Sequence, residues 1–213
     1  MTRQHYRSTL AQFHQAFDVK PYGQLAPIER LALIPLRATL IAEETRELIE
    51  AISDVQHNPT EQNQAHLAKE CADLLYVTTG TAHLLDLPFV DPRSTSTTRN
   101  RFHAGMMVEW ASDFLQISLD DYFRGMDRKY EPELLEIMHE ELAPDIQQLG
   151  DAVHTFATAW SIPLALVFDA VHASNMSKLD PATSQAILRE DGKVLKGPGY
   201  FEPDITRILR AAG

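Results

Sequence analysis

Apolar residues recur along this chain at spacings of three, four and seven positions, which is the period of a helix with one buried face. The first such stretch runs from Leu31 to Val55, and the second runs from Leu67 to Leu85. Between them, Asn58-Pro59-Thr60 is typical of a turn, and Thr60 can cap the following helix. The pattern predicts two long helices that fold back on each other as an antiparallel hairpin.

Turn-forming residues divide the rest of the chain. A helix is expected near residues 3–17, the long second helix should open at Pro27, and helical structure should resume around Arg101 after a loop rich in Pro, Ser and Thr. Later, Ser161 is expected to be the N-cap of a helix that has Pro163 in its first turn. Every predicted element is a helix, so we expect an all-α fold, an antiparallel helical bundle.

The helices suggest three parts. Residues 1–87 are expected to form the first part of the bundle, 88–150 a helical insertion, and 151–213 the last core helix and a C-terminal loop. The segment 80–88 is loosely similar to 155–163, as if the end of one helix were repeated after an insertion. A chain of 213 residues with 44% hydrophobic residues can bury a substantial core around one domain plus an insertion.

The composition of the chain limits which binding partners and which cellular location are expected. The net charge of −11 argues against nucleic acid, because binding to its backbone normally needs a clustered basic face. The N-terminus has no apolar segment typical of a signal peptide, and the longest uncharged run is too short to span a membrane. The single cysteine, Cys71, falls on the apolar face of its helix and suggests a buried, reduced thiol. We therefore expect a soluble, cytoplasmic protein.

Four carboxylates occur as two pairs with the same spacing of three: Glu44 and Glu47, and Glu70 and Asp73. On a helix, residues three apart are surface neighbours, so each pair offers two oxygen ligands on one side. The first pair ends 11 residues before Asn58, and the second begins 10 residues after Thr60. The hairpin should therefore bring all four carboxylates to the same level.

The position of these acids on the helix also points to a metal site. At about 100° per residue, Glu44 falls inside the apolar stripe of the first helix, Glu47 at its edge and Glu43 just beyond it. Like charges in a half-buried hairpin repel each other and lose hydration unless a cation compensates. Ligands that are all oxygen favour Mg²⁺ or Mn²⁺ over zinc. The sequence therefore predicts a magnesium site, with Mn²⁺ as the other suitable ion.

Two other interpretations use the same kinds of residue. Glutamates 43, 44, 47 and 50 could form a charged helix surface paired with Arg46 or Lys69, but this explains neither the second pair nor the apolar stripe. Glu136 and His139 form an ExxH, the ligand pair of di-iron bundles. A di-iron site needs two such pairs and the chain has one ExxH, so we expect these two to be ordinary surface residues.

The C-terminal third carries groups that suit a phosphate ligand. Asn175 and Lys178 lie three apart near the end of a helix, while Lys193 and Lys196 follow the Asp191-Gly192 turn signal and precede Tyr200. A basic loop that covers a polyphosphate is the functional interpretation. Lys178 could instead stabilise the helix C-terminus, the loop lysines could be solvated, and Tyr200 could either stack on a base or pack on the helix.

A family resemblance rests on an ordered set of motifs. They are Glu43-Glu44-x-x-Glu47 with Glu70-x-x-Asp73, and the segments 13–17, 72–77, 171–178 and 191–198. These motifs resemble those of the all-α nucleoside triphosphate pyrophosphohydrolases, which include MazG, dimeric dUTPases and phosphoribosyl-ATP pyrophosphohydrolase. The last two segments are similar to the MazG-like and phosphoribosyl-ATP pyrophosphohydrolase-like branch. The resemblance covers roughly residues 5–86 and 152–208.

The resemblance implies a specific activity. It indicates a Mg²⁺-dependent enzyme that hydrolyses the bond between the α and β phosphates of a (deoxy)nucleoside triphosphate, in the manner of a house-cleaning enzyme of the nucleotide pool, with Glu43 as the base. Relatives are generally dimers or tetramers, so a homodimer or higher homo-oligomer is expected. Three alternatives stay open: phosphoribosyl-ATP as the substrate, a nucleotide-binding regulator without turnover, and an interaction bundle without a site.

Overall fold

The computed structural model describes residues 5–94, 100–187 and 194–213. These residues fold into helices and connecting loops, with no strand beyond an isolated bridge between Leu179 and Ala186, so the predicted all-α fold is confirmed. The elements are α1 (His5–Ala16), the 3₁₀ helix η1 (Tyr22–Gln24), α2 (Pro27–His57), α3 (Glu61–Leu84), α4 (Arg101–Asp127), α5 (Pro132–Trp160), α6 (Leu164–Met176) and α7 (Ile205–Ala212).

The hairpin of α2 and α3 forms as the sequence predicts. Asn58 ends α2, and the Thr60 side chain accepts a hydrogen bond from the backbone N–H of Asn63 at 3.2 Å, which caps the start of α3. The Asn63 side chain in turn donates to the carbonyl of Asn58 at 2.8 Å. These bonds fix a short turn, and α2 and α3 pack against each other along their length.

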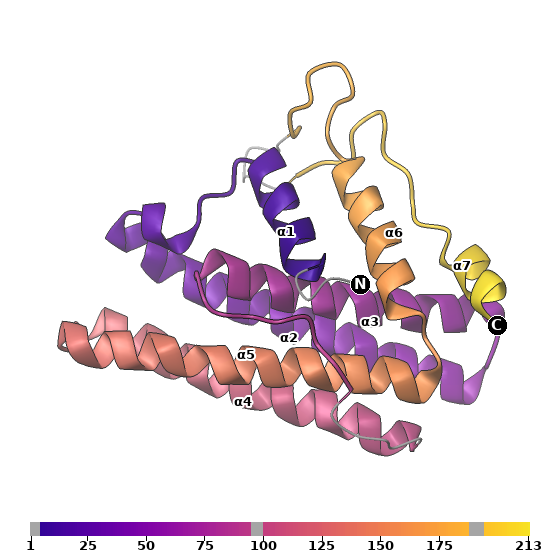
Figure 1. The fold of residues 1–213 in the computed structure, drawn as a ribbon, viewed down its shortest axis with the longest axis horizontal. Helices are drawn as coiled ribbons and strands as arrows, with labels where there is room; N and C mark the ends of the chain where they lie inside the picture. Colours follow the sequence, from indigo (N-terminus) through magenta and orange to yellow (C-terminus); the bar gives the residue numbers. More distant parts are fainter. Residues whose placement is uncertain (1–4, 95–99, 188–193) are drawn as a thin grey trace.

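A second hairpin, α4 and α5, completes a four-helix bundle. Helix α4 packs against α2, and α5 packs against α3, so the four long helices lie alongside one another (Figure 1). Their facing sides bury aliphatic and aromatic residues that have no solvent-exposed surface, which excludes water from the centre of the bundle. These include Ile41, Leu48, Leu74, Leu75, Val108, Leu115, Leu119, Leu142, Ile146, Leu149, Val153 and Phe156.

Helix α3 is the central element of the fold. One side of it belongs to the bundle, and α1, α6 and α7 pack against another side, where α1 and α6 cross the long helices steeply (Figure 1). Small side chains such as Ala68, Ala72 and Ala82 allow neighbours to approach, and Cys71 is a fully buried free thiol, as expected. Because α3 carries the second acid pair, it places that pair between the bundle and the crossing helices.

The region expected to be an insertion is part of the main core. Helix α5 runs without interruption through residue 150, where the sequence suggested a boundary, and α4 and α5 supply half of the bundle. The apolar faces of these helices therefore serve the same core as α2 and α3. Helices α4 and α5 therefore pack as integral parts of the bundle.

The break between α5 and α6 differs from the expected one. Ser161 lies in the left-handed region (φ 58, ψ 35) and ends α5, with its backbone N–H donating to the carbonyls of Ala157 and Thr158. Pro163, not Ser161, is the N-cap residue of α6, so the expected cap is wrong. A left-handed residue closes the last carbonyls of a helix, which explains why Ser161 serves the preceding helix.

The described residues contain no single helix that is long and apolar enough to cross a membrane. Helices α5 and α6 meet that test of length and composition only when taken together, and they are bent by 114° at the break between them.

Candidate active site

Three carboxylates converge where the middles of α2 and α3 meet. Glu44, Glu47 and Glu70 each offer one oxygen, and these atoms all lie within 4.8 Å of one another. Glu70 is only 2% exposed, whereas Glu44 and Glu47 are partly exposed. The two acids of α2 come close to α3 because they neighbour Leu48, which is fully buried. We call Glu44, Glu47 and Glu70 the carboxylate cluster.

The pKa values of the cluster reflect crowding and loss of water. The pKa of Glu44 is raised to about 8, mainly by burial and also by the nearby charges of Asp73, Glu47 and Glu70, against an opposing effect of Lys69. Burial is also the main cause of a raised pKa at Glu70. A nearby positive charge would therefore stabilise the ionised form of these carboxylates.

Lys69 supplies part of that charge in this structure. Its Nζ lies 2.9 Å from Glu70 Oε1 and 2.6 Å from Asp73 Oδ2, so it bridges two of the predicted metal ligands. Burial lowers the pKa of Lys69, but the charges and hydrogen bonds of Asp73 and Glu70 outweigh this effect and raise it above the ordinary value. Asp73 thus contacts an ammonium group, while the other three predicted ligands form the cluster.

The environment of one oxygen atom in the cluster indicates whether a metal ion would fit there. Glu70 Oε2 is buried and has no hydrogen-bond partner among the described residues, whereas Glu70 Oε1 contacts Lys69 and lies 3.1 Å from His66 Nδ1. A buried carboxylate oxygen without a partner is costly. A cation bound by Glu44, Glu47 and Glu70 would satisfy it, and the all-oxygen donor set suits a hard divalent ion.

A cavity of about 460 Å³ opens beside the cluster, between α2, α3, α6 and the C-terminal loop. On its α6 side, Lys178 Nζ donates to Asn175 Oδ1 at 2.7 Å. Burial lowers the pKa of Lys178, against the opposing influence of Tyr200 and Asp73. On the α3 side, the Tyr76 hydroxyl lies 3.1 Å from His172 Nδ1. Acidic groups thus line one wall of the cavity, and a lysine and an amide line the opposite one.

The C-terminal loop is held against α6 by hydrogen bonds. Ser174 Oγ donates to the carbonyl of Phe201 at 2.8 Å, and the Phe201 N–H donates to Ser177 Oγ at 3.1 Å. Gly197 lies so close to α6 that a Cβ atom there would come within 2.9 Å of the Lys178 carbonyl oxygen. This close approach places the residues on either side of Gly197 at the rim of the cavity.

Two residues of the loop interact with each other at that rim. The Lys196 ammonium lies 4.3 Å from the centre of the Tyr200 ring and 3.3 Å from a carboxylate oxygen of Glu202. Both Lys196 and Tyr200 line the cavity. The loop therefore presents a cation and an aromatic ring toward the space in front of the carboxylates.

The structure brings together most of the residues predicted for the site. The cavity gathers six of the ten: Glu44, Asp73, Asn175, Lys178, Lys196 and Tyr200. Glu47 and Glu70 join it through the carboxylate cluster. Lys193 lies outside the described residues. The individual roles of these residues stay predictions.

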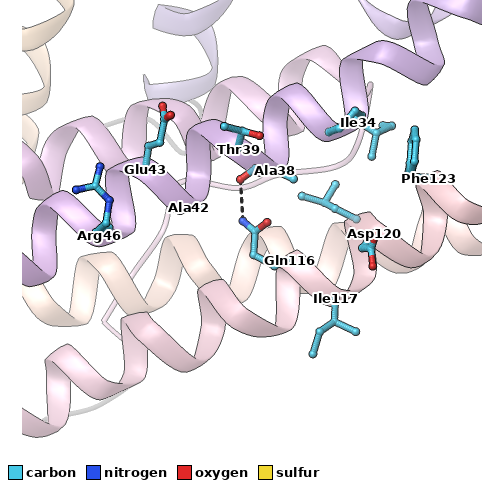
Figure 2. A pocket seen from close by; sticks show the side chains of 12 residues that line it. Ile34, Ala38, Thr39, Ala42, Glu43, Arg46, Gln116, Ile117, Asp120 and Phe123 are labelled. Carbon is cyan, nitrogen blue, oxygen red and sulfur yellow. Dashed lines mark hydrogen bonds between the residues drawn. The ribbon is translucent and has the colours of Figure 1, made fainter.

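Glu43 lies apart from this cavity. It is exposed and lines a groove between α2 and α4, together with Arg46 and Gln116 (Figure 2). Gln116 donates to the carbonyl of Ala38 at 2.9 Å across that groove. Consecutive residues of a helix point about 100° apart, which is why Glu43 and Glu44 face different spaces.

Among the residues that line the cavity but were not expected in the site are Lys69, Tyr76 and Glu202. Lys69 directly precedes Glu70 and lies one helical turn before Asp73, a spacing that permits ion pairing within the helix. The sequence offered Lys69 only as a surface partner of glutamates. No local pattern marks Tyr76 or Glu202, which reach the cavity through tertiary packing.

The ExxH pair forms no metal site with other described residues. Glu136 is exposed, in agreement with a surface position. His139 is half-buried and stacks on Tyr22, with ring centroids 5.3 Å apart, so the surface interpretation is wrong for it. Burial lowers the pKa of His139, which fits a neutral packing role.

The fold and the site together define an all-α protein in which a carboxylate cluster lies beside a cavity that Lys178 and Lys196 also line. The sequence model of the phosphoribosyl-ATP pyrophosphohydrolase family matches residues 10–100, a range that contains Glu44, Glu47, Glu70 and Asp73. The match covers less than half of the chain, and it bears out the resemblance of this segment to the MazG-like and phosphoribosyl-ATP pyrophosphohydrolase-like branch of the all-α nucleoside triphosphate pyrophosphohydrolases.

The family supports a nucleotide pyrophosphohydrolase-like activity, and its members typically depend on a divalent metal ion. Comparison with curated proteins and with solved structures gave no significant match.

Proposed function

We propose that this protein is a Mg²⁺-dependent nucleoside triphosphate pyrophosphohydrolase that converts a (deoxy)nucleoside triphosphate to the monophosphate and pyrophosphate. The observation that carries the proposal is a buried carboxylate oxygen, Glu70 Oε2, that has no partner in the described part of the chain and belongs to a cluster of three carboxylates beside a cavity that Lys178 and Lys196 line. Acidic ligands for a cation and basic groups for phosphate are what a metal–triphosphate substrate requires. A house-cleaning role in the nucleotide pool is part of the proposal, as the sequence resemblance implies.

The residues divide into two sets by chemistry. Glu44, Glu47, Glu70 and Asp73 would hold the ion, which when bound supplies charge neutralisation at phosphate oxygens and a place for the attacking water. Lys178 and Lys196 would bind the oxygens of the polyphosphate, and Asn175 would orient Lys178, as its hydrogen bond does here. Tyr200 lies at the rim, where its ring can stack on a base.

Glu43 remains the proposed base, but it faces the neighbouring groove and the cavity does not include it. For Glu43 to act on the attacking water, its side chain would have to turn toward Glu44 or reach the water through a second water molecule. The proposed role of Glu43 therefore needs an experiment that distinguishes loss of a catalytic base from loss of metal binding.

Substitution at three glutamates separates these roles. Glu70→Gln should lower Mg²⁺-dependent release of pyrophosphate at least about 100-fold and weaken Mn²⁺ binding, because it removes a charged ligand. Glu43→Gln should lower kcat about 100-fold or more while Mn²⁺ affinity is kept, because it removes only the base. Glu50→Gln is the control, since Glu50 is exposed and pairs with Arg46. Circular dichroism checks that the helices are kept.

Specific outcomes would overturn these assignments. A fully active Glu70→Gln enzyme excludes the metal site, and an active Glu43→Gln enzyme leaves the base elsewhere. A wild-type protein that binds triphosphates but releases no pyrophosphate, across a panel of normal and modified nucleotides and phosphoribosyl-ATP, would instead be a nucleotide-binding regulator.

We also propose that the protein forms a homodimer or a higher homo-oligomer. Helix α4 carries large apolar side chains that are more than half exposed and share one face of the helix at about 100° per residue: Phe102, Trp110, Phe114 and Ile117. Several exposed large apolar side chains on one face of a helix support association with another protein chain.

A further inference from the structure

The four predicted metal ligands do not all have the same neighbours in this structure. Three carboxylates converge within 4.8 Å of one another, but the fourth, Asp73, is paired with Lys69 at 2.6 Å. The same ammonium contacts Glu70 Oε1 at 2.9 Å and leaves Glu70 Oε2 without a partner among the described residues. Lys69 therefore joins Asp73 to one member of the carboxylate cluster, Glu70, through a single ammonium group.

The position of Lys69 on α3 explains this contact. It precedes Asp73 by one helical turn, where an ammonium and a carboxylate on the same face can pair. Its side chain is 41% exposed and lines the cavity, so the ammonium has room to leave the carboxylates without a change in the helix. The Asp73 side chain is 19% exposed and is therefore the more shielded member of the pair.

We propose that Lys69 acts as a built-in counter-cation: its ammonium pairs with Asp73 and with Glu70 Oε1 when no divalent ion is bound, and it must release Asp73 for the ion to be fully coordinated. The inference rests on the proposed function. Lys69 is thus a positioning residue, which acts on the ion through Asp73. It stabilises the metal-free protein and lowers its affinity for the metal.

These two effects have opposite signs, which makes the proposal testable. In metal-free Lys69→Met, the melting temperature should fall by about 3 °C, because Asp73 and Glu70 lose the ammonium group that pairs with both. The same variant should bind Mn²⁺ about tenfold more tightly by calorimetry, because one competing ion pair has been removed. A lysine with a merely structural role would lower the melting temperature without tightening Mn²⁺ binding.

Arg46→Met is the matched control. It removes one positive charge from the neighbouring helix, but Arg46 is exposed and pairs mainly with Glu50 at 2.9 Å. Its Mn²⁺ affinity should change less than about twofold. Lys69→Arg keeps a cation next to Asp73 and should therefore retain the wild-type melting temperature without the gain in Mn²⁺ affinity.

A double-mutant cycle tests whether the effect passes through Asp73. In an Asp73→Asn background, Lys69→Met should tighten Mn²⁺ binding less than it does in the wild-type background, since one of the two carboxylates that Lys69 contacts is absent. An equal gain in both backgrounds would show that Lys69 acts only by general charge repulsion, and would overturn the proposal.

A measurement on the wild-type protein keeps the proposal testable if Lys69→Met does not fold. Acetylation of Lys69 by a water-soluble succinimidyl ester, followed by mass spectrometry, should become several-fold faster when Mg²⁺ is added, because the ammonium is released. Lys20, which is exposed in the loop after α1, should be acetylated at an unchanged rate and serves as the internal control. An unchanged rate at Lys69 would overturn the inference.

The results also separate this inference from the proposed function. If wild-type protein binds no Mn²⁺, the metal site itself is wrong, and the role of Lys69 is wrong with it. If wild-type protein binds Mn²⁺ and Lys69→Met binds it no more tightly, only the inference about Lys69 is overturned.

Discussion

His14 shows how burial controls a single ionisable group in this fold. Its side chain is packed between α1 and α3, where its ring stacks on that of His83 at 5.1 Å between centroids. Burial, followed by the nearby charges of His83 and Arg37, lowers the pKa of His14 from 6.5 to about 3. Arg37 is itself buried and donates to Thr81 Oγ1 and to the Val77 carbonyl, so a proton on His14 would add a second positive charge there.

This pKa makes folding stability depend on pH. Between pH 6.5 and 3 the unfolded chain binds a proton at His14 that the native protein does not bind, so the free energy of unfolding should fall by up to about 1.4 kcal/mol per pH unit as the pH decreases. Urea unfolding at pH 6.5 and 4.5 measures the effect. The free energy of unfolding should change less between these two pH values for His14→Gln than for the wild-type protein. Equal changes in the two proteins would contradict the lowered pKa of His14.

Gly197 is a second residue whose identity is set by its surroundings. A Cβ atom at this position would lie 2.9 Å from the Lys178 carbonyl oxygen, which belongs to the backbone and cannot easily move. Gly197→Ala should push the loop away from α6, together with Lys196, and raise KM for triphosphates about tenfold. Gly199→Ala is the control, because its nearest neighbour, Pro181 Cδ, is at an ordinary 3.5 Å. Equal kinetics of both variants would show that the loop does not contact the substrate.

Residue-level prediction from sequence succeeded where helical periodicity was enough. Glu44, Glu47 and Glu70 meet because their distances from the Asn58–Thr60 turn are nearly equal, which is a property of the sequence alone. The role of Lys69 could not be deduced, because spacing shows only that it can pair with Asp73. Which charged side chains pair with each other depends on burial and on the distances between helices, and a local sequence pattern encodes neither.

At the scale of the element, the end of α5 stores strain. Ser161 adopts a left-handed conformation (φ 58, ψ 35), which costs more for a residue with a Cβ atom than for glycine. Ser161→Gly should therefore raise the free energy of unfolding by about 0.5–1 kcal/mol, measured by urea unfolding. Ser161→Ala keeps the Cβ atom and should give no gain. A gain of the same size in both variants would place the effect in the hydroxyl group and not in the backbone.

The helices themselves were largely predictable. The long helices around the acid pairs were expected from their apolar periodicity, and Arg101 begins α4 as expected. The junction at Ser161 was misassigned because serine is a common N-cap, while the left-handed conformation that it adopts depends on how α5 and α6 pack. Continuity of α5 through residue 150 was also missed, since a boundary between structural parts has no periodicity of its own.

At the scale of the whole molecule, the exposed face of α4 predicts self-association. Trp110→Glu and Phe114→Glu should each weaken a dimer about 100-fold or more, because each substitution occurs twice in a symmetric interface. Light scattering during size-exclusion chromatography measures the mass. Ile28→Glu is the control, since Ile28 is 71% exposed but lies on α2, outside this face. A wild-type protein that stays monomeric at high concentration would exclude the interface.

The arrangement of the whole bundle was only partly predictable. An all-α bundle follows from the sequence, but the sequence treated residues 88–150 as an addition, whereas α4 and α5 are half of the four-helix core. A helix has an apolar face both when it packs on the outside of a complete bundle and when it is one of the helices that form the bundle. Only the contacts of α4 with α2, and of α5 with α3, decide between these two possibilities.

The ion pair between Lys69 and Asp73 also has a consequence for how the protein is made. The four acidic ligands lie within the first 73 residues, and Asn175 and Lys178 follow about a hundred residues later. A ribosome therefore delivers the acidic half well before the groups that face it. Because Lys69 leaves the exit tunnel together with its carboxylates, the nascent chain carries its own neutralising charge during that interval.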